Sequence, residues 1–158
     1  MAVRHHHYTI DTEWTGNRGT GTSRYDAYGR DHVMRAKGKP DILGSADPHF
    51  RGDAARWNPE ELLVAALSAC HELSYLHMCA VNGVVVIAYS DEAEGWMDDE
   101  KGAGEFTRVL LKPRVTITAQ SNAAMARELH HQAHENCFIA RSVDFPVEHA
   151  PVIVKEGD

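Results

Sequence analysis

The alternation of apolar and polar residues divides the chain into a strand-rich first third, a long apolar helix and a second section of strands and helix. Residues 8–14 alternate as a strand, and residues 20–25 and 32–35 are expected to form further strands. Residues 36–57 are rich in Gly, Pro, Asp and Arg and have no clear periodicity. We therefore expect a long loop there, and long loops inside small domains are often functional.

The best-defined element is a helix that begins after Asn58 and ends before Gly83. Asn58 is an N-cap residue, Pro59 follows at the first helical position, and Glu61 is placed to close a capping box. Gly83 supplies the stop signal of a helix C-terminus. The run at 62–70 is apolar on all sides, which predicts a helix that is buried all round.

The second half of the chain is expected to contain a β-hairpin, a second helix and a final strand. In chain order these are strands at 84–96 and 106–119 around a turn at 98–104, a helix to residue 136 capped by Ser121 or Asn122, a helical turn beginning at Cys137, and a strand at 146–154. The final strand is placed at a sheet edge because its prolines cannot donate to a ladder. This order predicts an α+β fold with an antiparallel sheet, and 158 residues suit a single domain spanning 1–158.

Composition narrows the possible functions. The net charge is −7 and no cluster of Lys and Arg is present, so we expect no nucleic-acid partner. The longest uninterrupted apolar stretch, residues 62–69, is far too short to span a bilayer. The first residues lack the apolar core of a signal peptide. We therefore expect a cytoplasmic protein without a membrane partner.

Three cysteines, Cys70, Cys79 and Cys137, raise the question of thiol chemistry. A reducing cytoplasm keeps thiols free, so cysteines there are usually buried filler, metal ligands or redox-active groups. Cys70 is followed by His71 and Glu72, so the apolar helix turns polar there and its outer half is expected to meet a site. Cys137 opens a helical turn, where the backbone dipole favours a thiolate.

Three segments carry a specific combination of motifs: Asn58-Pro59-Glu60-Glu61-Leu62-Leu63 with Ser68-Ala69-Cys70, then Asn136-Cys137, and near the N-terminus Trp14-Thr15-Gly16-Asn17-Arg18-Gly19. Together they resemble the OsmC/Ohr family, the osmotically inducible and organic hydroperoxide resistance proteins. The resemblance covers nearly the whole chain. It implies an OsmC-like fold, in which the sheet packs on the long central helix and a second helix, and an intertwined homodimer.

The resemblance also implies a role for each matching residue. Cys70 would be the peroxidatic cysteine, oxidised by an organic hydroperoxide to a sulfenic acid. Cys137 would resolve it as a disulfide, which a lipoyl or thioredoxin-like dithiol then reduces, without any cofactor. Because Cys70 lies mid-helix, a cation must stabilise its thiolate. Arg18 matches the family's loop arginine best, Arg51 is a competitor, and Glu60 would orient the arginine.

Two alternatives to the peroxidase remain. A metal site is conceivable because His130, His134 and Cys137 stand at i, i+4 and i+7, with His71 and Cys70 available to complete it. The chain has no CxxC and no HExxH pattern to support that site. The other alternative is a non-catalytic role in binding a small molecule. The residues whose roles stay open are His71, His77 and Cys79.

Two further expectations concern the substrate and the assembly. The apolar helix, with Phe50 and Trp57 from the long loop, suggests a pocket wall that favours hydrophobic hydroperoxides. Glu60 and Cys70 are ten residues apart, about 15 Å along a helix axis, so Glu60 cannot readily position a cation at Cys70 of its own chain. Two copies of the helix packed antiparallel about Ala65 would bring Glu60 of one chain level with Cys70 of the other, which predicts a homodimer.

Overall fold

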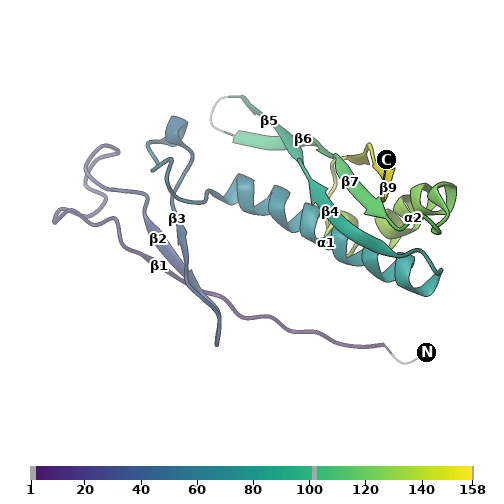
Figure 1. The fold of residues 1–158 in the computed structure, drawn as a ribbon. Helices are drawn as coiled ribbons and strands as arrows, with labels where there is room; N and C mark the ends of the chain where they lie inside the picture. Colours follow the sequence, from purple (N-terminus) through teal and green to yellow (C-terminus); the bar gives the residue numbers. More distant parts are fainter. Residues whose placement is uncertain (1–2, 101–102, 158) are drawn as a thin grey trace. The chain divides into compact units, whose positions relative to one another are not determined.

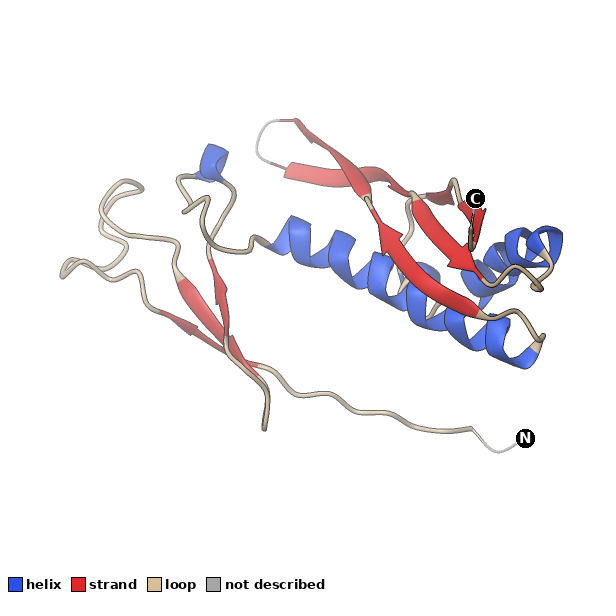
Figure 2. Cartoon of the chain, viewed as in Figure 1, coloured by secondary structure: helices blue, strands red, loops and turns tan. Residues whose placement is uncertain are grey.

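The computed structural model describes residues 3–100 and 103–157. Its helices and strands (Figures 1 and 2) are β1 (Asp11–Trp14), β2 (His32–Arg35), β3 (Ile42–Gly44), α1 (Pro59–Val81), β4 (Val86–Asp91), β5 (Glu94–Glu100), β6 (Ala103–Leu111), β7 (Pro113–Ile117), α2 (Ala123–Asn136), β8 (Val147–His149) and β9 (Val152–Lys155), with 3₁₀ turns at Pro48–Phe50 and Ala140–Ser142. The α+β class is confirmed. The chain forms two compact units, Met1–Leu62 and Leu63–Asp158, so the single domain stays a prediction.

The first unit contains an antiparallel sheet in the order β1-β2-β3. The strand expected at 20–25 is wrong, because that segment forms turns and bends. Gly19 and Gly21 adopt φ values of 107° and 56°, and both donate their N–H to the Asn17 side-chain oxygen. Positive φ values suit glycine and interrupt an extended strand. The loop expected at 36–57 includes the short strand β3 and one 3₁₀ turn.

Helix α1 begins and ends where its local signals predict. The Glu61 N–H donates to Asn58 Oδ1 at 2.7 Å, and the Asn58 N–H donates to Glu61 Oε2 at 3.3 Å, which completes the capping box. Gly83 ends the helix with φ 71°. Helix α2 is likewise capped by Asn122, whose Oδ1 accepts from the Ala124 and Met125 N–H groups.

The long hairpin expected in the second unit is divided into two three-stranded sheets, ordered β4-β7-β9 and β5-β6-β8. Asp91 lies where β4 ends, and its carboxylate accepts from the Lys112 N–H at 2.7 Å and from Ser68 Oγ on α1 at 2.6 Å. Pairing is antiparallel for β4–β7 and β5–β6, as predicted, but β8 and β9 pair parallel with β6 and β7. The final segment occupies an edge of each sheet, as its prolines indicate.

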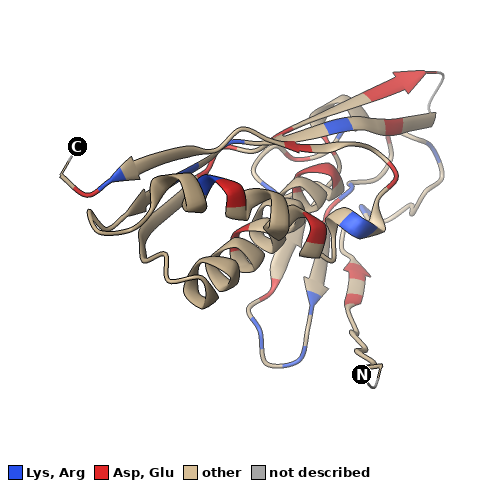
Figure 3. Ribbon diagram, turned by 90° about the vertical axis from the view of Figure 1, so that its right-hand side faces the viewer, with Lys and Arg blue, Asp and Glu red and all other residues tan. Residues whose placement is uncertain are grey.

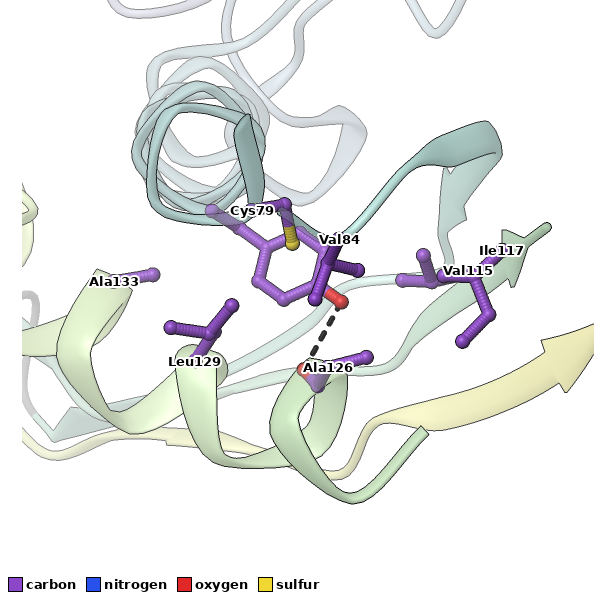
Figure 4. Packing of buried hydrophobic residues seen from close by; sticks show 8 residues of the cluster. Cys79, Val84, Val115, Ile117, Ala126, Leu129 and Ala133 are labelled. Atoms are coloured by element: carbon purple, nitrogen blue, oxygen red, sulfur yellow. Dashed lines mark hydrogen bonds between the residues drawn. The ribbon is translucent and has the colours of Figure 1, made fainter. Parts of the chain in front are cut away.

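One side of α1 packs into two buried clusters. Leu67 lies with Val109 and Leu111 of β6. Two turns further on, Tyr75 lies in a second cluster with Leu129 of α2, which is drawn in Figure 4. Truncating a fully buried leucine such as Leu67 to alanine typically costs about 2–5 kcal/mol, so this face holds the second unit together.

The other side of α1 is exposed in the single chain. Ala65, Ala69 and Leu73 are exposed, and Leu73 has 68% of its surface accessible. The expectation of a helix buried all round is therefore wrong for one chain. Contiguous exposed apolar residues of this kind often mark an interaction surface.

Length and composition alone would allow α1 to cross a membrane. Core helices of soluble proteins pass the same test, so this is weak evidence for a membrane span. Charged residues gather elsewhere in the second unit, for example at the acidic end of β5 (Figure 3). Location in the cytoplasm stays a prediction.

Candidate active site

Two predicted site residues, Cys70 and Cys137, lie in contact although they are distant in the sequence. Cys70 is half-buried in the middle of α1, whereas Cys137 follows the last residue of α2 and is fully buried. The Cys70 side chain acts on the Cys137 thiol as a hydrogen-bond partner that raises its pKa, and both are free cysteines. The fold of the second unit therefore brings the two thiols to one place.

The contact between the thiols is one of several polar contacts between the two helices. In order along α1 these are Cys70 to Cys137, His71 Nε2 to His130 Nδ1 at 3.0 Å, and Tyr75 Oη to the Ala126 carbonyl at 3.0 Å. Each step forward along α1 is a step backward along α2, so the helices run in opposite directions. This register places the C-terminal end of α2, with Cys137, beside the middle of α1.

The surroundings of Cys137 favour its protonated form. Burial, followed by the hydrogen bond to Cys70, raises the pKa of the Cys137 thiol to about 11. The backbone N–H groups of Ala140 and Ile139 act in the opposite direction, and the Ala140 nitrogen lies 3.4 Å from Cys137 Sγ. These donors have the effect expected for the start of a helical turn, but burial outweighs them. Cys137 is thus a neutral thiol that can donate to Cys70.

Cys70 lies on the wall of a groove of about 880 Å³. Among the other residues that line the groove, Leu73, Met78 and Phe138 are apolar and Ser74 and His77 are polar. Most of the lining is apolar, and Phe138 is 78% exposed, so an apolar molecule could reach the sulfur of Cys70 from solvent. Phe50 and Trp57 belong to the first unit, and their place in the pocket wall stays a prediction.

The remaining predicted site residues lie in the first unit. Arg18 and Arg51 are both exposed, and Arg51 is the one non-glycine residue with positive φ in the described part of the chain. Within residues 3–100 and 103–157, neither arginine forms an ion pair with Glu60. Glu60 Oε2 is buried without a hydrogen-bond partner, which is costly for a carboxylate. The choice between the two arginines stays open.

A third arginine, which the sequence reasoning missed, lines the same cavity as Glu60. This cavity of about 230 Å³ lies within the first unit. The Arg30 guanidinium lies 4.3 Å and 4.1 Å from the ring centres of Tyr25 and Tyr28, and it donates to the backbone carbonyls of both. Such stacking and bonding hold a guanidinium in one orientation. In the sequence, the signal for this arrangement is the pair Tyr25 and Tyr28 shortly before Arg30.

A cluster of histidines lies on the side of α1 that faces α2. The ring of His71 is centred 5.3 Å from that of His130 and 5.6 Å from that of His149, while His149 lies 5.8 Å from His134. Tyr75 stacks on His130 at 3.8 Å. In the sequence, His71, His130 and His134 were candidate metal ligands. His149 was not, because only the pairing of β8 with β6 brings it to the helices.

Burial keeps the imidazoles of His71 and His130 neutral. It is the main cause that lowers the pKa of His71 to about 4 and that of His130 to about 3, and neighbouring histidines add to the effect. Neutral imidazole is the form that binds metal ions. Among residues 3–100 and 103–157, however, no three His, Cys, Asp or Glu side chains are arranged to hold a metal ion. Cys137 contacts Cys70 instead of forming a ligand set with His130 and His134.

Comparison with known families gives one match to a family model. The model described as OsmC-like protein matches residues 52–150. This span contains Glu60, Cys70 and Cys137, and it leaves Arg18 and Arg51 outside.

Known proteins resemble the chain over most of its length. The uncharacterised protein YmaD of Bacillus subtilis is 24% identical over 147 residues, covering 90% of each chain. The structure of an OsmC-like protein of unknown function from Vibrio cholerae is 33% identical, with a TM-score of 0.84, and covers 94% of this chain and 100% of its own. The organic hydroperoxide resistance protein OhrB of Bacillus subtilis has a TM-score of 0.63 at 17% identity, covering 94% and 98%. This last likeness concerns the fold alone.

The buried histidines should make the protein sensitive to acid. Their folded pKa values lie below the ordinary value of 6.5, so the unfolded chain binds protons that the folded chain does not. Stability is then complete above pH 6.5 and falls as the pH decreases towards 4. We expect each of the two histidines to cost on the order of 3 kcal/mol of stability between pH 7 and pH 4, measured by urea denaturation at a series of pH values.

The matched variants for this experiment are His130→Phe, which can keep the stacking on Tyr75, and His77→Gln, at an exposed position of α1. His130→Phe should reduce the dependence on pH by about half, because His71 remains, and His77→Gln should leave it unchanged. Equal slopes for the wild type and His130→Phe would contradict the assignment.

Proposed function

The chain belongs to the OsmC-like protein family, and on that premise we propose that it is a thiol-dependent peroxidase that reduces organic hydroperoxides. The observation that carries the proposal is the contact between Cys70 and Cys137 at an apolar groove. Some proteins of similar fold are named organic hydroperoxide resistance proteins, which supports the same class of substrate.

In the first step, the Cys70 thiolate attacks the outer oxygen of a hydroperoxide in the groove. The O–O bond breaks, the alkoxide takes a proton and leaves as an alcohol, and Cys70 becomes a sulfenic acid. Cys70 is suited to this role because it is the cysteine that lines the groove. Cys137 is fully buried and its raised pKa keeps it protonated, so it does not compete with Cys70 for the hydroperoxide.

In the second step, Cys137 sulfur attacks the sulfenic sulfur of Cys70. A disulfide forms, and the sulfenic hydroxyl leaves with the Cys137 proton as water. Because Cys137 is already a neighbour of Cys70, it is placed to make this attack. A lipoyl or thioredoxin-like dithiol then reduces the disulfide by thiol–disulfide exchange and is itself oxidised.

A homodimer would complete the site. Glu60 is about 15 Å from Cys70 along α1, and the exposed face of α1 has the small residues Ala65 and Ala69 that let a second helix approach closely. In an antiparallel pair of α1 helices, Glu60 and an arginine of one chain would stabilise the thiolate of the other. Arg18 and Arg51 are the candidate arginines in this proposal.

The roles of the cysteines can be separated by mutation. Cys70→Ser should abolish hydroperoxide consumption, because the attacking sulfur is lost. Cys137→Ser should allow about one turnover per site and leave a sulfenic acid on Cys70, since resolution alone is lost. Peroxide titration with intact-mass readout measures both effects. Cys79→Ser is the control, since Cys79 is buried in a different cluster. Equal damage by Cys79→Ser would reject the assignment.

The apolar lining of the groove should favour hydrophobic substrates. We expect kcat/KM for cumene hydroperoxide to exceed that for hydrogen peroxide by at least about tenfold, because the groove can shelter the aromatic part. Phe138→Ala should lower the value for cumene hydroperoxide and leave that for hydrogen peroxide unchanged. Competition kinetics with the two oxidants test this, and equal efficiency in the wild type would refute it.

The shared site can be tested by complementation. Glu60→Ala and Cys70→Ser chains should each be inactive, and mixing them under subunit exchange should form heterodimers with one intact site. At equal amounts half of the dimers are mixed, so we expect about one quarter of wild-type activity to return. A fully active monomer, or no recovery despite demonstrated exchange, would exclude the shared site.

A further inference from the structure

Two buried side-chain hydrogen bonds join α1 to α2 beside the cysteine contact. The first, between His71 and His130, lies immediately next to Cys70 in the sequence. The second, from Tyr75 to the Ala126 carbonyl, lies one helical turn further away. Because His71 is the residue after Cys70, any movement of His71 relative to α2 also moves Cys70.

The histidine pair is held tightly in place. His71 is 1% exposed and His130 is fully buried, so neither ring can exchange its partner for bulk water. Breaking the bond would leave a buried donor and acceptor unpaired, which costs more than the bond itself contributes. Tyr75 stacks on His130 at 3.8 Å and limits the movement of its ring. The bond of 3.0 Å therefore sets the distance between the helices near the two thiols.

Disulfide formation depends strongly on that distance. A disulfide requires sulfur atoms about 2.05 Å apart and a narrow range of Cα separations. The equilibrium between a dithiol and its disulfide reflects how often the second sulfur occupies the bonding position. A small displacement of one reacting group can reduce this occupancy considerably.

We infer that His71 and His130 are positioning residues, whose hydrogen bond holds α2 against α1 so that Cys137 remains placed to close a disulfide with Cys70. This inference rests on the proposed function, because it assumes that these two thiols are a redox pair. It assigns a role to His71, which the sequence left open. It needs no metal ion and no contact of either histidine with the substrate.

The test is a redox equilibrium with glutathione, in the absence of hydroperoxide. One oxidised glutathione converts the two protein thiols into a disulfide and yields two reduced glutathione molecules. The measured quantity is the equilibrium constant, from mass spectrometry of trapped thiols with the Cys70–Cys137 disulfide mapped. We expect His71→Leu to lower the constant about fivefold, the worth of one hydrogen bond. His71→Gln, whose side-chain nitrogen can replace Nε2, should stay within about twofold of the wild type.

Two further variants keep the result interpretable. His130→Phe should reproduce the loss while preserving an aromatic ring beside Tyr75, which covers the case that His71→Leu fails to fold. Tyr75→Phe is the matched control, because it removes the other hydrogen bond between α1 and α2 and leaves the histidine pair intact. It should reduce stability but change the redox constant less than about twofold.

The outcomes separate this inference from the proposed function. It is overturned if Tyr75→Phe shifts the constant as much as His71→Leu, since a general loss of packing would then explain both. It is also overturned if the wild type forms no Cys70–Cys137 disulfide with oxidised glutathione. A disulfide that depends on the histidine pair, in a protein that does not consume hydroperoxides, would support the inference and reject the peroxidase.

Discussion

The packing of α1 against α2 is the constraint on which the candidate site depends. Tyr75 and Leu129 share a buried cluster, and the hydrogen bond between His71 and His130 joins the two helices next to the cysteines. With this packing the end of α2 lies beside the middle of α1. Cys137 therefore meets Cys70 because of packing around other residues, and the thiol contact is a consequence of the core.

Burial is also the main cause of the electrostatic properties of the site. It raises the pKa of Cys137 and lowers that of His71 and His130, since in each case it opposes the charged form. These three side chains are therefore neutral near pH 7. Cys70 differs from them because it is only half-buried and lines the groove. Cys70 and His71 are consecutive residues of α1, yet the thiol of Cys70 is accessible and the ring of His71 is buried.

Local sequence signals predicted the elements whose ends are set by local chemistry. Asn58, Glu61 and Gly83 were sufficient to place α1, because a capping box and a glycine stop act within a few residues. The strand expected at 20–25 failed for a related reason. Two glycines with positive φ outweighed its β propensity, and sequence alone does not reveal which φ a glycine adopts.

The sequence by itself determined the family, the two helices and the candidate cysteines, since these rest on motifs and on short-range spacing. Tertiary structure decided the rest. The division of the hairpin into two sheets, the parallel pairing of β8 and β9, and the arrival of His149 at the helices all depend on contacts between distant segments. The exposure of one side of α1 belongs here too, because an apolar helix has the same sequence pattern whether its own chain or a partner covers it.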